Sequence, residues 1–401
     1  VHTLSDVLNL RALAQQPPDS VAVLYGEQGM QRSRDYVRTA TVESVFERSV
    51  SLAALLAFWL LGGFGWLDTL IRRWCESDPA CGLLFFAALA LGYAAMSAPF
   101  DVYHTFVTEA RFGFNRTTWR TFVADRLKGV ALFAFLGGLL LSGILLLFQH
   151  AGSLAWLICW LAVVLFSLVV QWLGPALILP LFNRFTPMPE GALRDAIVRY
   201  AESVAFPLQN VYVIDGSRRS SRANAYFTGL GRTRRIAIFD TLIAQHSVDE
   251  IVSVLAHEVG HYRLRHVAKG LLIGAVHTGL ALFLLSLLLP QPALYQALAV
   301  STPSLHAGFI SFALLFTPVE VLLSLLANLM SRRHEFAADR FAVDTAPSPA
   351  GLSDGLKRLS VVNLTHPNPH PFHVVLNYSH PPLAQRLRAI EERLVDPHAT
   401  G

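Results

Sequence analysis

Six uninterrupted apolar stretches constrain this 401-residue chain more than any other feature. Most are long enough, at 1.5 Å per helical residue, to cross the hydrocarbon core of a bilayer. Apolar residues make up 53% of the chain and charged residues 15%, and the mean hydropathy is +0.44, which is unlike a soluble core. We predict membrane-spanning helices at Ser51–Leu70, Leu83–Ala98, Val130–Phe148, Leu154–Leu173, Leu271–Leu289 and Phe309–Met330. The second is short, and it reaches Val102 only if it includes Asp101.

The charges between these stretches predict the topology. Two loops, 149–153 and 290–306, contain no Lys, Arg, Asp or Glu, whereas 101–128, 183–269 and 331–401 are rich in Arg. By the positive-inside rule the Arg-rich regions face the cytosol, and six spans then place the start of the chain there too. Arg72 and Arg73 do not fit this scheme, since they would lie on the opposite side.

This topology divides the chain into five regions. We expect a cytosolic N-terminal segment (1–50), four spans with a cytosolic loop at 101–128 (51–182), a cytosolic region with a small sheet and a metal-binding helix (183–268), two further spans (269–330) and a C-terminal cytosolic region (331–401).

Charge and cysteine content restrict the partners and the compartment. The net charge of +4 and the pI near 9.1 favour anionic lipid headgroups, and no base-stacking or basic-helix module indicates nucleic acid. Three lysines stand against 29 arginines, which favours a high-GC, bacterial genome. Cys75 and Cys81 lie in a loop assigned to the non-cytosolic side, where a disulfide and two free thiols are both possible.

The motif with most chemical content is His257-Glu258-Val259-Gly260-His261. Ser247 and Glu250 form a capping-box pattern that starts a helix here, and residues four apart on a helix share a face. His257 and His261 can therefore bind one metal ion while Glu258 holds a water against it, as in zinc hydrolases. The alternative is a core helix with two hydrogen-bonded histidines.

A catalytic zinc needs a third protein ligand, with a fourth position left for water. The best candidate is Glu335, in the segment Ser331–Val343 that follows the last apolar stretch. Asp339 lies one helical turn further on and could orient a ligand histidine. Without the HExxH motif, this segment would be an ordinary charged helix leaving a membrane.

Three short β-rich segments precede the metal-binding helix. Val211–Ile214 and Ile236–Phe239 predict strands, and Ala225–Phe227, ending at Gly229–Gly231, predicts a third. The edge of such a sheet can bind an extended peptide by strand addition. Asn224 could then hold a substrate amide, although an Asn at such a position is often only a turn residue.

From about Asp19 to Ile390 the chain resembles the type I CAAX prenyl endopeptidases, which are integral-membrane zinc metalloproteases. The matching motifs occur in one order: FGFNRTTWRTFVADRLKG (112–129), SRANAYFTGLG (221–231), HEVGH (257–261), SRRHEFAADRFA (331–342) and YSHPPLAQRL (378–387).

The resemblance implies a role for individual residues. It implies one Zn²⁺ bound by His257, His261 and Glu335, with Glu258 as general base, Asp339 orienting a ligand, Asn224 and Arg386 binding substrate, and His380 stabilising the oxyanion. It also implies a mainly α polytopic protein whose spans enclose a chamber, capped by a cytosolic zinc domain.

Two departures from the family pattern qualify this expectation. The family has seven spans, and Leu8–Arg11 resembles the end of its first, so that helix is expected to be cut away or absent. The chain also lacks an endoplasmic-reticulum retrieval signal. We therefore expect a bacterial inner-membrane protein, or an endoplasmic-reticulum protein if eukaryotic, with its active site facing the cytosol.

The expected function is hydrolysis of a peptide bond in a peptide or membrane-protein substrate, with or without an attached lipid. Within the same class, a quality-control protease without prenyl specificity is an alternative. From another class, a transporter or lipid-binding protein with a vestigial zinc site, or a zinc-stabilised scaffold, would share the spans and intramembrane polar groups such as His277 and Glu320.

Overall fold

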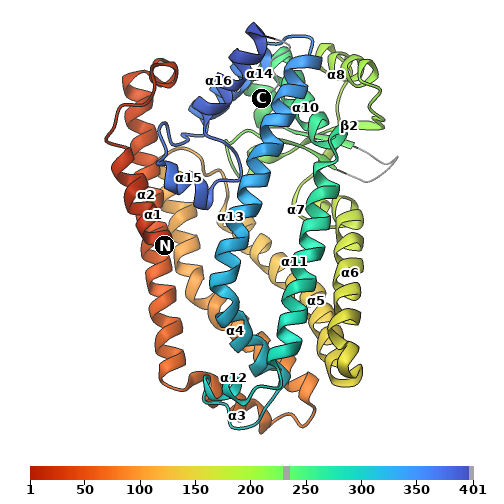
Figure 1. Ribbon diagram of the computed structural model, residues 1–401. Helices are drawn as coiled ribbons and strands as arrows, with labels where there is room; N and C mark the ends of the chain where they lie inside the picture. The colour runs from red at the N-terminus through yellow and green to blue at the C-terminus, as the bar shows by residue number, and fades with distance from the viewer. Residues whose placement is uncertain (229–234, 397–401) are drawn as a thin grey trace.

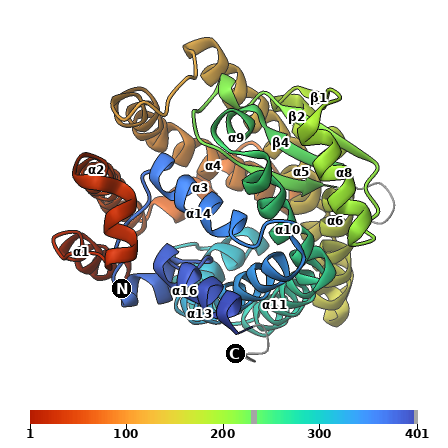
Figure 2. The same ribbon diagram turned by 90° about the horizontal axis from the view of Figure 1, so that it is seen from above.

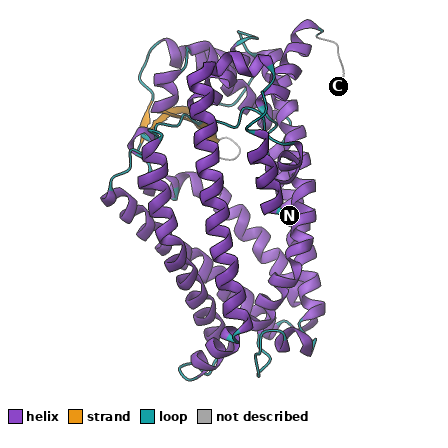
Figure 3. Ribbon diagram, turned by 90° about the vertical axis from the view of Figure 1, so that its left-hand side faces the viewer, coloured by secondary structure: helices purple, strands orange, loops and turns teal. Residues whose placement is uncertain are grey.

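Long helices form most of the molecule, and a small sheet lies near one end (Figures 1 and 3). The computed structural model describes residues 1–228 and 235–396. Its elements are α1 (His2–Ala12), α2 (Asp19–Leu60), α3 (Gly63–Arg72), α4 (Asp78–Tyr103), the π-helical turn η1 (His104–Glu109), α5 (Trp119–His150), η2 (Gly152–Leu154), α6 (Ala155–Leu177), α7 (Leu179–Phe182), β1 (Phe185–Pro187), α8 (Ala192–Ser203), β2 (Asn210–Ile214), η3 (Gly216–Arg218), β3 (Ala225–Thr228), β4 (Arg235–Phe239), α9 (Asp240–Gln245), α10 (Val248–Arg263), α11 (His266–Leu288), α12 (Pro292–Gln296), α13 (Leu305–Thr345), α14 (Gly351–Val362), α15 (Pro371–Asn377) and α16 (Leu383–Val395).

Five helical segments are long and apolar enough to cross a membrane, and they carry five of the six predicted spans. They are Asp78–Glu109, Trp119–His150, Gly152–Phe182, His266–Leu288 and Leu305–Thr345. Only 6–17% of their most apolar windows is buried within the protein. A tightly packed bundle would bury one face of every helix. Most of the surface of these windows is therefore left for lipid or solvent, and the expected chamber stays a prediction.

The first predicted span, Ser51–Leu70, is not one straight helix. The chain bends by 65° between α2 and α3. Gly62 adopts φ +75°, which glycine reaches without a steric penalty, and this turn ends α2. The hydropathy pattern predicted α2 and α3 as one span because the residues on both sides of the turn are apolar. At its other end α2 begins at Asp19, so helix also occupies most of the predicted N-terminal segment.

Two further boundaries differ from the prediction. The short second span lies inside α4, which starts at Asp78 and continues through η1 to Glu109. The predicted loop 101–128 is therefore helical at both ends. Helix α1 has 11 residues and packs against α15, where Ser5 Oγ lies 2.9 Å from His373 Nδ1.

The four-stranded sheet has the order β1-β2-β4-β3. Strands β2 and β4 are parallel, and β1 and β3 pair antiparallel on the two edges. The three predicted strands are confirmed, whereas β1 was missed because it is only three residues long and includes Pro187. The predicted end of the third strand, Gly229–Gly231, lies outside the described residues.

Helix α10 is the centre of the domain beside the sheet (Figure 2). Its residues Ile251, Leu255 and Val259 are each 1% exposed, and they share a core with Ile236 and Ile238 of β4. Helices α8, α13 and α14 pack around α10. Burying each such side chain contributes about 1.5–3 kcal/mol, so the helix is held rigidly on several sides.

The three cysteines are free thiols, and so the structure contains no Cys75–Cys81 disulfide. The Cys81 thiol instead donates a hydrogen bond to the backbone oxygen of Cys75, at 3.0 Å.

Candidate metal centre

The helix that carries the HExxH motif starts where the sequence predicts. The Ser247 hydroxyl accepts a hydrogen bond from the Glu250 N–H at 3.3 Å, and the Ser247 N–H donates to Glu250 Oε2 at 2.9 Å. This capping box satisfies two backbone donors that the first helical turn leaves free. The helix then runs without a break to Arg263 and holds His257 and His261 on one face.

Helix α13 carries the third candidate ligand to this face. It continues beyond the predicted span to Thr345, so Glu335 and Asp339 belong to the same helix that crosses the membrane (Figure 1). Gly260 allows the two helices to approach closely. A Cβ at that position would lie 3.1 Å from both the Cα and the carbonyl oxygen of Ala338. The glycine of HEVGH therefore helps to set the ligand spacing.

The three candidate ligand atoms form a tight triangle. The His257 and His261 Nε2 atoms are 3.0 Å apart, and they lie 3.5 Å and 3.2 Å from the Glu335 carboxylate oxygens. A tetrahedral zinc with bonds of about 2.0–2.1 Å spaces its ligand atoms about 3.3 Å apart. Among the described residues this is the single group of His, Cys, Asp and Glu side chains with metal-binding spacing. The residues present therefore fit one metal ion.

The other ring nitrogen of His257 contacts a buried carboxylate. His257 Nδ1 lies 2.7 Å from Asp339 Oδ1, and Asp339 is 1% exposed. Burial opposes a charge on His257, but hydrogen bonds to Asp339 and Glu335 outweigh it and raise the pKa of His257 to about 9. Such surroundings favour a cation between these side chains.

Arg386 neutralises part of this buried negative charge. Its guanidinium donates to both Asp339 oxygens, through Nε at 2.8 Å and Nη2 at 2.5 Å. Its Nη1 lies 3.7 Å from Glu335 Oε2. The resemblance suggested a substrate-binding role for Arg386. The structure places it on Asp339, behind His257, with its side chain 11% exposed.

Glu258 follows His257 in the HExxH motif, and His380 contacts the Glu335 carboxylate. Burial raises the pKa of the Glu258 carboxyl, which makes it a stronger base at neutral pH. His380 is largely exposed, and its Nδ1 is 2.8 Å from Glu335 Oε2. That oxygen is buried, and apart from this contact with His380 it has no hydrogen-bond partner among the described side chains, so it is available as a metal ligand.

Asn224 lies at the start of the edge strand β3. Its side-chain oxygen accepts a hydrogen bond from the Ala225 N–H at 2.9 Å, and its backbone oxygen accepts one from the Phe239 N–H at 3.1 Å. Helix α10 packs against β3, so the edge strand that follows Asn224 lies beside the HExxH helix.

Two histidines at the centre were not singled out from the sequence. His266 Nδ1 lies 3.0 Å from His261 Nδ1, and the ring of His334 stacks on His266 with centroids 4.0 Å apart. The pattern HExxHxxxxH was a usable signal, but in a continuous helix His266 would lie on another face.

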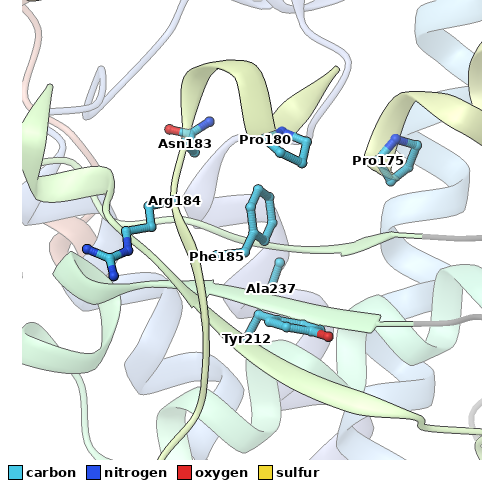
Figure 4. A pocket seen from close by; sticks show the side chains of 7 residues that line it. All are labelled: Pro175, Pro180, Asn183, Arg184, Phe185, Tyr212 and Ala237. Carbon is cyan, nitrogen blue, oxygen red and sulfur yellow. The ribbon is translucent and has the colours of Figure 1, made fainter. Parts of the chain in front are cut away.

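A cavity of about 290 Å³ lies elsewhere, between the α6–α7 junction and the sheet. Figure 4 shows Phe185 near Pro180 on one side and Tyr212 and Ala237 on the other. The metal ligands do not line this cavity, so we do not assign it to the metal centre.

Apolar spans, an HExxH helix and a carboxylate from a second helix together define an integral, multi-pass membrane metallopeptidase. Comparison with known families agrees. Residues 6–184 match "CAAX prenyl protease N-terminal, five membrane helices", and residues 187–394 match "Peptidase family M48". The chain belongs to peptidase family M48.

Its relatives cover nearly the whole chain. It is 36% identical over 404 residues to the CAAX prenyl protease 1 homolog of Oryza sativa subsp. japonica, with 97% of this chain and 94% of that protein covered. It is 34% identical to the CAAX prenyl protease 1 of Saccharomyces cerevisiae, covering 90% and 85% of the two. The crystal structure of S. mikatae Ste24p superposes with a TM-score of 0.91 at 30% identity, covering 97% and 96%.

Proposed function

We propose that this protein is a zinc endopeptidase that cleaves a peptide bond at the membrane surface. The observation that carries the proposal is the triangle of His257, His261 and Glu335 with Glu258 beside it. Two imidazoles and one carboxylate are the ligand set of many catalytic zinc sites, and they leave one position for substrate or water.

Zinc bound here would polarise the scissile carbonyl and make a water molecule acidic. Glu258 accepts the proton of that water and later delivers it to the leaving amine. His380, which reaches the edge of the ligand triangle, donates a hydrogen bond to the carbonyl oxygen as negative charge develops on it. Asp339 holds His257 in the orientation that points Nε2 at the metal.

The substrate lies extended along β3. This strand has one neighbour, β4, and its other edge is unpaired within the described sheet. Backbone hydrogen bonds to such an edge fix the register of a peptide without reading its sequence. Asn224, exposed at the head of the strand, binds a substrate backbone amide. Arg386 acts indirectly, because its donors already bind Asp339.

The substrate class follows from the relatives, several of which are named CAAX prenyl protease 1. We infer that the protein cleaves near the lipidated C-terminus of a protein, with the lipid in the space between the spans. We infer that the metal centre faces the cytosol, because the positive-inside rule predicts that side for the Arg-rich regions, and that the membrane is a bacterial inner membrane, which the excess of arginine over lysine favours. The boundary between the two matched regions supports a division close to residue 185, with the spans His266–Leu288 and Leu305–Thr345 inside the peptidase region.

The variant Glu258→Gln tests the mechanism, because it keeps the shape of the side chain and removes the base. We expect the purified variant to retain one zinc per chain and to cleave a peptide at least about 10³-fold more slowly. Cleavage at the wild-type rate would contradict the mechanism. Cleavage by the wild type that a chelator does not inhibit would exclude a metallopeptidase.

A pair of matched peptides tests the substrate class. The two share one sequence and differ only in a farnesyl group on the cysteine. A kcat/KM at least about tenfold higher for the farnesylated peptide supports the proposal, since a buried isoprenoid adds binding energy. Equal values would favour a broader quality-control protease.

A further inference from the structure

The two ligand histidines of the metal centre are held by different partners. Behind His257 lies the carboxylate of Asp339, itself bound by Arg386. Behind His261 lies another imidazole, because His266 Nδ1 is 3.0 Å from His261 Nδ1. His266 is 7% exposed and follows the HExxH helix directly.

A break between two helices creates this contact. In an uninterrupted helix, a residue five positions on lies about 140° around the axis, so His261 and His266 could not face each other. Helix α10 ends at Arg263, and Arg265 adopts φ +57° and ψ +34° before α11 begins at His266. That left-handed conformation is costly for a residue other than glycine. The strained residue lies at the turn that brings His266 into contact with His261.

The third side chain of the group comes from α13. The His334 ring stacks on His266 with centroids 4.0 Å apart and an angle of 12° between the rings. His334 precedes the candidate ligand Glu335, so the helix that provides the third ligand also restrains the His266 ring. His266 is therefore positioned from two elements at once.

The protonation of the pair follows from the geometry. His261 points Nε2 at Glu335 and His257, so a metal at the centre binds that nitrogen. The neutral ring then carries its proton on Nδ1 and donates it. His266 Nδ1 is the atom within reach, and it must accept this hydrogen bond.

We propose that His266 is a positioning residue of the metal centre, which accepts a hydrogen bond from His261 Nδ1–H and so holds His261 ready to bind the metal. This inference rests on the proposed zinc site and extends it. A ligand histidine with a fixed ring loses less entropy on binding metal, and removal of such a partner typically weakens metal affinity 10- to 100-fold.

Matched substitutions at position 266 separate a hydrogen bond from packing. Asn and Leu have nearly the same shape, but only Asn offers an acceptor, through its side-chain oxygen. Phe can stack on His334 but has no acceptor. Asp places a carboxylate behind His261, as Asp339 does behind His257.

The measurement is zinc affinity by chelator competition on the purified full chain in detergent. We expect His266→Asn to lie within about threefold of wild type, His266→Leu and His266→Phe to be about 10- to 100-fold weaker, and His266→Asp to be at least as tight as wild type. The visible spectrum of Co²⁺-substituted protein should be native in His266→Asn and altered in His266→Phe. If His266→Leu does not fold, the comparison of Asn with Phe still decides.

Equal zinc affinities for the Asn and Phe variants, with both folded, would overturn the proposal. A wild-type protein that does not bind zinc would instead overturn the proposed function. The two failures are distinct, since one concerns the variants and the other the parent protein.

Discussion

Two buried His–Asp–Arg groups lie at opposite ends of the molecule (Figure 1), and among the described residues one of them adjoins the candidate metal ligands. At the α10 end, His257 Nδ1 is 2.7 Å from Asp339, which Arg386 binds. At the α3 end, His306 Nε2 is 2.6 Å from Asp68 Oδ1, and Arg72 Nε is 3.1 Å from Asp68 Oδ2.

The difference lies in the second nitrogen of each histidine. His257 Nε2 faces His261 and Glu335, whereas His306 Nδ1 is buried without a hydrogen-bond partner among the described residues. The His306 ring packs against Phe85, with centroids 4.8 Å apart. The free nitrogen of His257 therefore meets further candidate ligands, whereas the Asp68 group connects α3 to the start of α13.

The largest expected effect is the loss of a ligand. Glu335→Ala should abolish stoichiometric zinc binding, since two histidines alone hold the metal weakly. Elemental analysis of purified protein measures this. Asp68→Asn, at the other end, is the control and should keep one zinc per chain. Full zinc occupancy in Glu335→Ala would remove Glu335 from the ligand set.

The second effect contrasts the two aspartates. Asp339→Asn should weaken zinc binding about 10- to 100-fold, because the partner of His257 loses its charge. Asp68→Asn should leave zinc affinity unchanged and cost stability, about 1–3 kcal/mol, since a neutral amide replaces the charged partner of His306 and Arg72. Zinc titrations and thermal unfolding of both variants measure these effects. Equal losses of zinc affinity in Asp339→Asn and Asp68→Asn would contradict the difference between the two groups.

The third effect concerns helix spacing. Gly260→Ala should cost about 1–3 kcal/mol and weaken zinc binding, because the new methyl group would push α10 away from Ala338. Gly92→Ala is the control, since a Cβ there meets no atom within 4 Å. Unchanged melting and zinc affinity in Gly260→Ala would show that the close approach does not set the ligand geometry.

The smallest expected effect is a pH dependence of stability at His366, which belongs to neither of the two His–Asp–Arg groups. His366 Nε2 donates to Asn9 O at 3.1 Å, and its Nδ1 accepts from the Asn368 N–H at 3.1 Å, so the native ring is neutral. Burial lowers its pKa from 6.5 to about 4.

Between these values the unfolded chain takes up a proton that the folded chain does not. The stabilisation by a neutral His366 is therefore complete above about pH 6.5 and decreases as the pH falls toward 4. We expect acidification from pH 7 to 5 to cost wild type about 1–2 kcal/mol more than His366→Asn, read as the difference in melting temperature. Melting temperatures of wild type and His366→Asn that fall by the same amount between pH 7 and 5 would contradict this prediction.

Five of the predicted spans and the paired histidines of the HExxH helix were predictable from the sequence for a shared physical reason. Apolar length and four-residue spacing are local patterns that survive in a folded helix, as in HEVGH. The bend at Gly62, strand β1 and the contact of His266 with His261 depend on backbone angles or on partners distant in sequence. Hydropathy and motif spacing carry no information on these backbone angles or on contacts between residues distant in sequence.

Metal-edge X-ray measurements on the purified protein test the central claim most directly. We expect one zinc per chain with two imidazole nitrogens and a carboxylate oxygen at about 2.0–2.2 Å, and an anomalous peak between His257, His261 and Glu335. Absence of stoichiometric zinc, or a peak away from these three side chains, would contradict the account.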